Sequence, residues 1–148
     1  MRGRVTNVLG SPPRAGKLSG KVPHGETMKI LVADDDPLIV QILRAGLRAQ
    51  GWDVVVAADA MQVSMFAMNA APDAILLDIN MPGGTGVTAL KRLKQSVKTA
   101  HIPVVVLSGT TDPQIPDTVR EMGAQTFLPK PVDLDEVVRV LNGLLGTG

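Results

Sequence analysis

Short apolar runs recur along the chain at intervals that leave room for a helix after each one. The runs are Ile30–Val32, Val54–Val56, Ala74–Leu77, Ile102–Leu107 and Thr126–Leu128. Apolar stretches that are continuous, rather than alternating with polar residues, are typical of strands buried on both faces of a parallel sheet. The pattern therefore predicts an α/β fold in which five strands alternate with helices that cover both faces of a doubly wound sheet.

Residues that favour the beginning or the end of a helix lie between these runs. Candidate N-cap residues, two of them followed by proline, are Asp36, Asp59, Asp112 and Asp133. The segment Asp133–Glu136 has the spacing of a capping box. Gly51 and Gly123 stand where helices are expected to end. The capping signals thus agree with the strand pattern on where the helices lie.

The composition suits one compact domain without disulfides. With 148 residues, of which 45% are hydrophobic, the chain has enough apolar side chains for a single core. Met61, Met65 and Met68 recur at helical spacing, and we expect them to belong to that core. The chain has no cysteine, and no apolar run approaches the roughly 20 residues needed to cross a bilayer. We expect a soluble, cytoplasmic protein without a membrane partner.

The first 27 residues differ from the remainder in charge and composition. They hold five basic residues against Glu26, are rich in glycine and proline, and show no hydrophobic period. Such a segment buries too little surface to offset its ordering entropy, so residues 1–27 are expected to be a disordered leader. Met28 is a candidate natural start, with cloning-derived sequence before it.

Residues 28–148, the predicted folded domain, are mildly acidic. They hold ten basic and thirteen acidic residues, and aromatic residues make up only 2% of the whole chain. Nucleic-acid binding depends on basic surfaces and on aromatic rings that stack on bases. We therefore expect no nucleic-acid partner.

Polar side chains follow four of the five predicted strands. They are Asp34 and Asp35 after the first strand, Asp78 after the third, Ser108 after the fourth and Lys130 after the fifth. Because chemistry in parallel sheets collects at the carboxyl ends of the strands, we expect these side chains to converge. Three carboxylates there repel one another, at roughly 4 kcal/mol for a pair 4 Å apart in an effective dielectric of 20. Such an all-oxygen site favours Mg²⁺, with Mn²⁺ as a substitute.

This set of side chains is suited to phosphoryl transfer. In that interpretation Asp78 is the nucleophile, and the metal neutralises its charge and the charge of the phosphoryl group. The Lys130 ammonium stabilises the equatorial oxygens in the transition state, and Ser108 donates a hydrogen bond to one of them.

Four segments around these residues resemble the receiver domain of bacterial two-component response regulators. They are Ile30–Pro37, Leu76–Gly83, Val105–Gly109 and Phe127–Pro131, and the resemblance extends over residues 28–148. It implies a flavodoxin-like fold with strand order 2-1-3-4-5. It also implies a signalling switch rather than an enzyme, with only self-phosphorylation from donors and slow self-dephosphorylation. A histidine kinase or a histidine phosphotransfer protein would phosphorylate Asp78.

The resemblance also implies how the metal is held. Asp35 and Asp78 would bind Mg²⁺ directly, and Asp34 would act mainly through water. Asn80 would contribute its backbone carbonyl. Asn80 and Thr110 would tune the lifetime of the phosphorylated state.

Signal output, by the same resemblance, begins with a movement of Ser108 toward the phosphoryl group. Phe127 would turn inward in place of the more common tyrosine, although filling the core explains this residue equally well. Lys130–Pro131 resembles the family's cis peptide. A downstream protein would bind roughly residues 112–145, and because only Gly146–Gly148 follow, we expect no attached output domain.

Three other functions compete with this interpretation. A haloacid-dehalogenase-like phosphohydrolase also uses an aspartate nucleophile, but Asn80 stands where its general acid is needed. The string Gly84–Ala89 has nucleotide-binding spacing but follows the third strand, so a turn beside Asp78 explains its glycines better. A receiver-like scaffold that is not phosphorylated would typically lack one of the acidic residues or the lysine, and none is missing here.

Overall fold

The structure is a computed structural model that describes residues 27–81 and 86–147. Its strands are β1 (Lys29–Ala33), β2 (Asp53–Ala57), β3 (Ala74–Asp78), β4 (Val104–Ser108) and β5 (Thr126–Pro129). Its helices are α1 (Pro37–Ala49), α2 (Ala60–Ala70), α3 (Gly86–Gln95), α4 (Ile115–Glu121) and α5 (Leu134–Leu145). None of these helices in the described chain is long and apolar enough to cross a membrane.

Two expectations concern residues that the structure does not describe. The expected leader at residues 1–27 lies outside the described part of the chain except for Thr27. Residues 82–85, which include the beginning of the expected turn after β3, also lie outside it.

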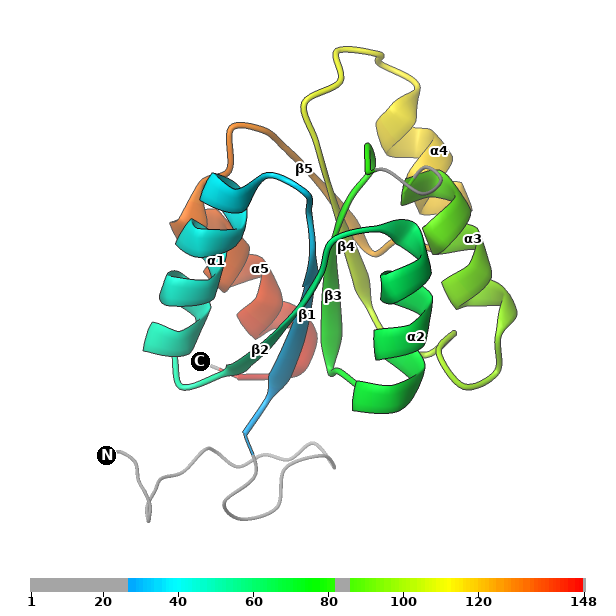
Figure 1. The fold of residues 1–148 in the computed structure, drawn as a ribbon. Coiled ribbons are helices and arrows are strands. Elements are labelled where there is room, and N and C mark those ends of the chain that lie inside the picture. The colour runs from blue at the N-terminus through cyan, green and yellow to red at the C-terminus, as the bar shows by residue number, and fades with distance from the viewer. Residues whose placement is uncertain (1–26, 82–85, 148) are drawn as a thin grey trace.

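The five strands of the described residues form one parallel sheet in the order β2-β1-β3-β4-β5 (Figure 1). β1 pairs with β2 on one side and with β3 on the other, so that Leu31 lies opposite both Val55 and Ile75. This order confirms the flavodoxin-like fold. In this order, β2 lies on one side of β1, and β3, β4 and β5 follow on the other side. The order of the strands therefore reverses between β1 and β3, and ligands bind at such a point in open α/β sheets.

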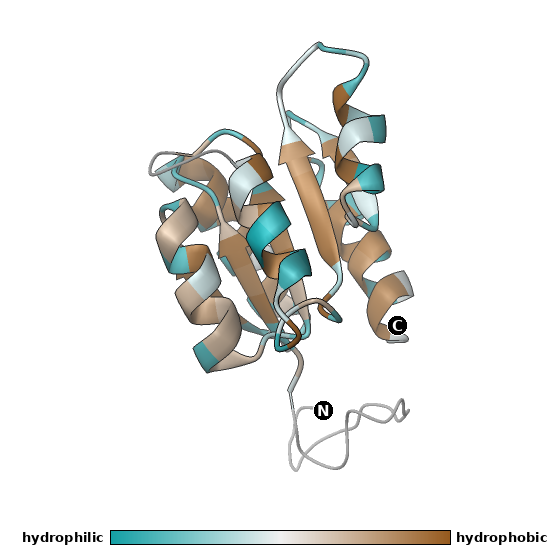
Figure 2. Cartoon of the chain, turned by 90° about the vertical axis from the view of Figure 1, so that its right-hand side faces the viewer, coloured by the Kyte–Doolittle hydropathy of each residue, from teal (hydrophilic) through white to brown (hydrophobic). Residues whose placement is uncertain are grey.

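Helices cover both faces of the sheet, with α1 and α5 on one face and α2, α3 and α4 on the other (Figure 1). Ile30 and Val32 of β1 join the core beneath α1 and α5, whereas Leu31 and Ala33 join the core beneath α2, α3 and α4. In Figure 2 the strands are brown along their length, whereas the helices mix brown and teal. Burial on two faces explains why the strands were recognisable as continuous apolar runs.

Three helices begin at the aspartate caps that the sequence predicts. Asp36, Asp59 and Asp133 each accept a hydrogen bond from a backbone N–H in the first turn of α1, α2 and α5. Gly51 and Gly123 follow the ends of α1 and α4 with φ angles of +87° and +108°, in the left-handed region that favours glycine. These ends of the helices are therefore determined by local sequence.

The start of α4 differs from the expectation that Asp112 caps it. The Asp112 carboxylate accepts a hydrogen bond from the Gln114 N–H at 2.9 Å, and α4 begins only at Ile115. An aspartate followed by proline also favours a turn, because proline fixes the backbone angle that the turn needs. Here the turn forms, and Pro116 occupies the first turn of the helix instead.

The expectation that the methionines of α2 form part of the core is wrong. Met61, Met65 and Met68 are 65%, 47% and 49% exposed. The buried face of α2 consists of three smaller residues, Ala60, Val63 and Ala67. Small side chains let the helix lie close to the sheet, and the larger methionines remain on the outside.

Both ends of the described chain lie at the amino edge of the sheet. β1 begins at this edge, and α5 runs antiparallel to the strands and ends there (Figure 1). The carboxyl ends of the strands, where polar residues gather, lie at the opposite edge.

Candidate functional site

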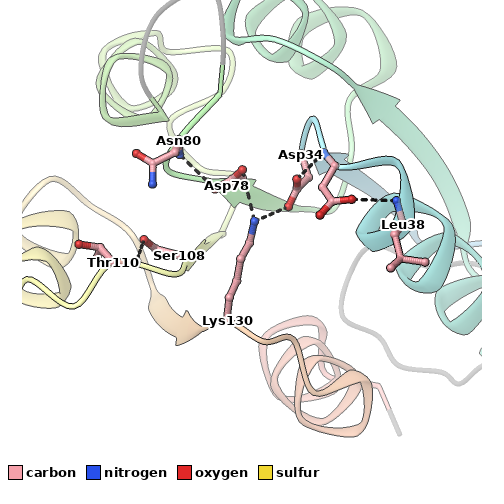
Figure 3. A network of polar contacts seen from close by, with 8 residues as sticks. Asp34, Leu38, Asp78, Asn80, Ser108, Thr110 and Lys130 are labelled. Carbon is pink, nitrogen blue, oxygen red and sulfur yellow. Dashed lines mark hydrogen bonds and ion pairs between the residues drawn. The ribbon is translucent and has the colours of Figure 1, made fainter.

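Four strands bring polar side chains to the carboxyl edge of the sheet. Asp34 directly follows β1, Asp78 is the last residue of β3, and Ser108 is the last residue of β4. Lys130 follows β5, and its side chain reaches toward both Asp34 and Asp78 (Figure 3). The structure thus brings together residues that are far apart in the sequence.

Three carboxylates form a compact acidic cluster at this edge. Asp34, Asp35 and Asp78 each offer one oxygen, and these oxygens lie within 4.8 Å of one another. Asp34 and Asp78 are buried, with 2% and 4% of their surface exposed, whereas Asp35 is exposed. The cluster therefore has two fixed, dry carboxylates and one that faces solvent.

The two buried carboxylates are held in the same way. Asp34 Oδ1 accepts a hydrogen bond from the Asp36 N–H at 2.9 Å, and Asp78 Oδ1 accepts one from the Asn80 N–H at 3.0 Å. In each case the other oxygen, Oδ2, faces Lys130. A short turn after each strand thus fixes the rotation of the carboxylate.

Lys130 provides the positive charge that the buried pair needs. Its Nζ lies 3.0 Å from Asp34 Oδ2 and 3.4 Å from Asp78 Oδ2. Its backbone N–H donates to the Ser108 carbonyl at 2.8 Å, and the peptide bond to Pro131 is cis, as the sequence led us to expect. The backbone around Lys130 is therefore fixed to β4 while the ammonium group spans the site.

The electrostatics of the site shift two ionisation equilibria. Burial raises the pKa of Asp78, and the Asp34 charge adds to this, although the Asn80 N–H and the Lys130 charge act in the opposite direction. Burial opposes the charged form of Lys130, but Asp34 and Asp78 together outweigh it, and the pKa of Lys130 is raised. Lys130 therefore remains an ammonium group, and ionised Asp78 carries an electrostatic cost.

Ser108 is fully buried and accepts a hydrogen bond at its hydroxyl oxygen. The donor is the Thr110 N–H, at 3.0 Å. Thr110 Oγ1 in turn accepts from the Asp112 N–H at 3.1 Å, and the Asp112 carboxylate holds Gln114. Successive turns thus connect Ser108 to the residue before α4. Because the Ser108 oxygen acts as an acceptor in this turn, its own hydrogen is left to donate.

Phe127 is half-buried and packs against the core beneath α2, α3 and α4. This position is compatible both with a residue that fills the core and with one that turns between two positions. A role of Phe127 in switching therefore stays a prediction.

The residues of the acidic cluster fit a divalent cation. Asp34 Oδ2 is buried, and apart from its ion pair with Lys130 it has no hydrogen-bond partner of good geometry among the described residues. The ligand atoms that the side chains of the cluster offer to a metal are all carboxylate oxygens, which Mg²⁺ prefers. One ammonium group facing two buried carboxylates also leaves a net negative charge for a cation to neutralise.

Sequence reasoning missed one residue beside the site. Gly86, the first residue of α3, lies against the backbone of Asp78 and Ile79. The sequence predicts only a turn for the glycines after β3. A glycine eight positions after a strand-end aspartate was the available signal, but only the packing shows why a side chain does not fit there.

A parallel sheet of this order, with an acidic cluster and a lysine at its carboxyl edge, defines the class of phosphorylatable receiver domains. The chain belongs to this class: the model of the response regulator receiver domain family matches residues 30–142. Members of the family are signalling switches of two-component systems rather than classical enzymes, and they bind Mg²⁺ at the acidic site. They interact with histidine kinases and with downstream targets.

The chain resembles members of this family in several bacteria. It is 34% identical over 119 residues to protein PilH of Pseudomonas aeruginosa, which covers 79% of this chain and 97% of PilH. It is 36% identical over 119 residues to the DNA-binding dual master transcriptional regulator RpaA of Synechocystis sp., which covers 79% of this chain and 48% of RpaA. The chain therefore spans about half the length of RpaA.

A solved structure shows the same fold with a metal. The receiver domain of the sensor histidine kinase PA1611 from Pseudomonas aeruginosa superposes with a TM-score of 0.75 at 26% identity, over 82% of this chain and 99% of that one. That structure has a magnesium ion coordinated in the active site cleft.

Proposed function

We propose that Asp78 of this chain accepts a phosphoryl group from a histidine kinase or a histidine phosphotransfer protein. The observation that carries the proposal is the Lys130 ammonium group, which lies 3.0 Å and 3.4 Å from the carboxylates of Asp34 and Asp78. A nucleophile at a strand end with a cation beside it matches the demands of phosphoryl transfer. The proposed receiver unit is residues 28–148, with residues 1–27 as a leader.

In the proposed transfer, a carboxylate oxygen of Asp78 forms a bond to phosphorus. The bond between phosphorus and the histidine nitrogen of the donor breaks, and its electron pair leaves with the imidazole, which then takes up a proton. Lys130 is positioned to pair with an oxygen of the transferred group because its ammonium already contacts Asp78. Ser108 can donate its hydroxyl hydrogen to another of these oxygens.

Proposed ligands for Mg²⁺ are the carboxylates of Asp34, Asp35 and Asp78 and the backbone carbonyl of Asn80, with Asp34 acting mainly through water. When bound, Mg²⁺ or a substituting Mn²⁺ supplies positive charge to the carboxylates and to the phosphoryl oxygens. Asp34 and Asp78 are buried whereas Asp35 is exposed, so the cluster is open to solvent on the side of Asp35. This opening supports the assignment.

Phosphorylation is proposed to shift an existing equilibrium of the surface at roughly residues 112–145, where a downstream protein binds. Hydrogen-bonded turns connect Ser108 to Gln114, the residue before α4, and they support this proposal. A new hydrogen bond from Ser108 to the phosphoryl group would alter the first of these turns. Thr110, Asn80 and Phe127 are proposed to tune the lifetime and the coupling. A cytoplasmic location is part of the proposal, and the absence of cysteine from the chain supports it.

The test is the intact mass of the protein after incubation with acetyl phosphate. Wild type in Mg²⁺ should gain one phosphoryl group, and the reaction should stop when a chelator removes the metal. Asp78→Asn, which preserves the shape of the side chain, should gain none. Asp117→Asn, a change at an exposed aspartate in α4, is the matched control and should behave as wild type. A phosphoryl group that persists in Asp78→Asn would falsify the assignment of the acceptor.

A further inference from the structure

Gly86 lies so close to the phosphoacceptor strand that no side chain fits. A Cβ atom added at Gly86 would lie 2.4 Å from the Asp78 carbonyl oxygen, 2.5 Å from the Ile79 Cα and 2.8 Å from the Ile79 carbonyl carbon. All three are backbone atoms, so no side-chain rotation could relieve the overlap. The structure needs glycine here because of space, since the residue is buried against the chain that carries Asp78.

Hydrogen bonds fix the same stretch of backbone. The Gly86 N–H donates to the Ile79 carbonyl at 2.7 Å, and the Ile79 N–H donates to the Leu107 carbonyl of β4 at 3.0 Å. The Asn80 N–H donates to Asp78 Oδ1 at 3.0 Å. The peptide group between Ile79 and Asn80 is therefore held at both of its polar atoms, by Gly86 at the carbonyl and by the Asp78 carboxylate at the N–H.

We propose that Gly86 is a positioning residue for Asp78 and Asn80. By fixing the peptide group between Ile79 and Asn80, it keeps the Asn80 N–H on Asp78 Oδ1 and thereby leaves Oδ2 directed at Lys130. The same peptide group precedes the Asn80 carbonyl, which is a proposed metal ligand. This inference rests on the proposed function of Asp78, but it concerns how the backbone presents that residue.

The other glycines that the structure describes do not have this role. The atoms nearest to a Cβ at Gly46 in α1 would belong to the flexible side chain of Leu134, and a Cβ at Gly143 in α5 would meet nothing within 4 Å. Among the described glycines, Gly86 therefore has a contact with the backbone of the acceptor strand that the others lack.

The first experiment compares Gly86→Ala with two controls in the full chain. Gly143→Ala adds the same methyl group to a helix where it meets nothing. Leu141→Ala destabilises the core beneath α1 and α5 without touching the site. Measurements are the Mg²⁺ dissociation constant from calorimetry, the rate of phosphorylation by acetyl phosphate, and the thermal midpoint.

Gly86→Ala should weaken Mg²⁺ binding and slow phosphorylation by about 10- to 100-fold, the range typical of residues that orient metal ligands. Both controls should keep the Mg²⁺ affinity of wild type, although Leu141→Ala should melt at a lower temperature. If wild type is phosphorylated and Gly86→Ala binds Mg²⁺ as tightly as wild type, the inference is wrong and the proposed function is unaffected. If wild type is not phosphorylated at all, the proposed function itself fails.

A second measurement needs no variant and remains decisive if Gly86→Ala does not fold. In metal-free wild type, the N–H groups of Gly86 and Asn80 should exchange with solvent at least about tenfold more slowly than expected for unprotected amides, because both are hydrogen bonded. Exchange of the Asn80 N–H at the unprotected rate would overturn the inference, since the peptide group would then not be held.

Discussion

At the scale of single residues, the site places one ammonium group between two buried carboxylates. Lys130 contacts Asp34 and Asp78 at the same time, and each carboxylate has one oxygen occupied by a backbone N–H. The arrangement satisfies most of the polar atoms but leaves an excess of negative charge. Without a metal, Asp78 is therefore ionised at some cost to the folded state.

The substitution Asp78→Asn should make the metal-free protein more stable at neutral pH. Burial raises the pKa of Asp78 above its ordinary value of 3.8, so the folded state binds this proton more tightly than the unfolded state does. The stability of wild type then falls as the pH rises from about 3.8 through the raised pKa. Asparagine carries no such charge and avoids this loss.

The measurement is the thermal midpoint in a chelator at a series of pH values from acid to neutral. The advantage of Asp78→Asn over wild type should grow across this series and then level off. Asp117→Asn, at an exposed position in the first turn of α4, should not melt above wild type at any pH, because the charge that it removes favours the helix N-terminus. An Asp78→Asn protein that is less stable than wild type at neutral pH would show that the pair with Lys130 outweighs burial.

At the scale of secondary-structure elements, α3 is attached to the segment before β4 by a lysine rather than by apolar packing alone. Lys94 Nζ donates to the Ala100 carbonyl at 3.1 Å and to the Ile102 carbonyl at 2.8 Å. Its burial lowers its pKa, which marks a charge held partly away from water. The two hydrogen bonds connect the last turn of α3 to the chain entering β4.

Lys94→Met should destabilise the protein by about 1–2 kcal/mol, because methionine keeps most of the side-chain volume but leaves the two carbonyl groups without their donor. Urea unfolding measures the difference. Lys91→Met, at an exposed position in the same helix, is the control and should lie within about 0.5 kcal/mol of wild type. Equal stability of the two variants would contradict a structural role for Lys94.

The outward face of α2 carries three exposed methionines, and they should contribute little to the stability of the protein. Replacing Met61, Met65 and Met68 together by glutamine should change the free energy of unfolding by no more than about 1.5 kcal/mol, because each residue is about half exposed or more. Val63→Ala, a change to a single fully buried residue in the same helix, should cost at least as much as the whole triple substitution. A loss of several kcal/mol in the triple variant would show that the methionines are buried in solution.

At the scale of the whole molecule, the sequence was sufficient to predict the fold and the edge of the sheet at which the polar side chains gather. Continuous apolar runs occur because the strands are covered on both faces, and residues that directly follow such runs necessarily lie at one edge. Ala60–Ala70 has no charged residue, however, so hydropathy could not tell which of its two apolar faces is buried. The contact of Gly86 with Asp78 could not be predicted either, because it depends on where α3 begins relative to β3 in space.

Metal binding and the stability of the whole domain should be linked through Asp35. In a chelator, Asp35→Asn should melt at or slightly above the temperature of wild type, because it removes one negative charge from the acidic cluster. Wild type should gain about 2.7 kcal/mol when Mg²⁺ is present at 100 times its dissociation constant, whereas the variant should gain much less at the same concentration. Thermal unfolding with and without Mg²⁺ checks both statements, and an equal gain in the two proteins would remove Asp35 from the ligand set.

The described chain begins at Thr27 and ends at Thr147, both at the amino edge of the sheet, and this bears on how the protein can be handled. A fluorescent label, an affinity tag or a sensor surface attached next to Thr147 would sit on the side opposite Asp78. A donor kinase approaching the acidic cluster would then meet an unobstructed face, and the tether would not compete with it. Association of kinase and receiver can therefore be followed on an immobilised chain, with the end of α5 as the point of attachment.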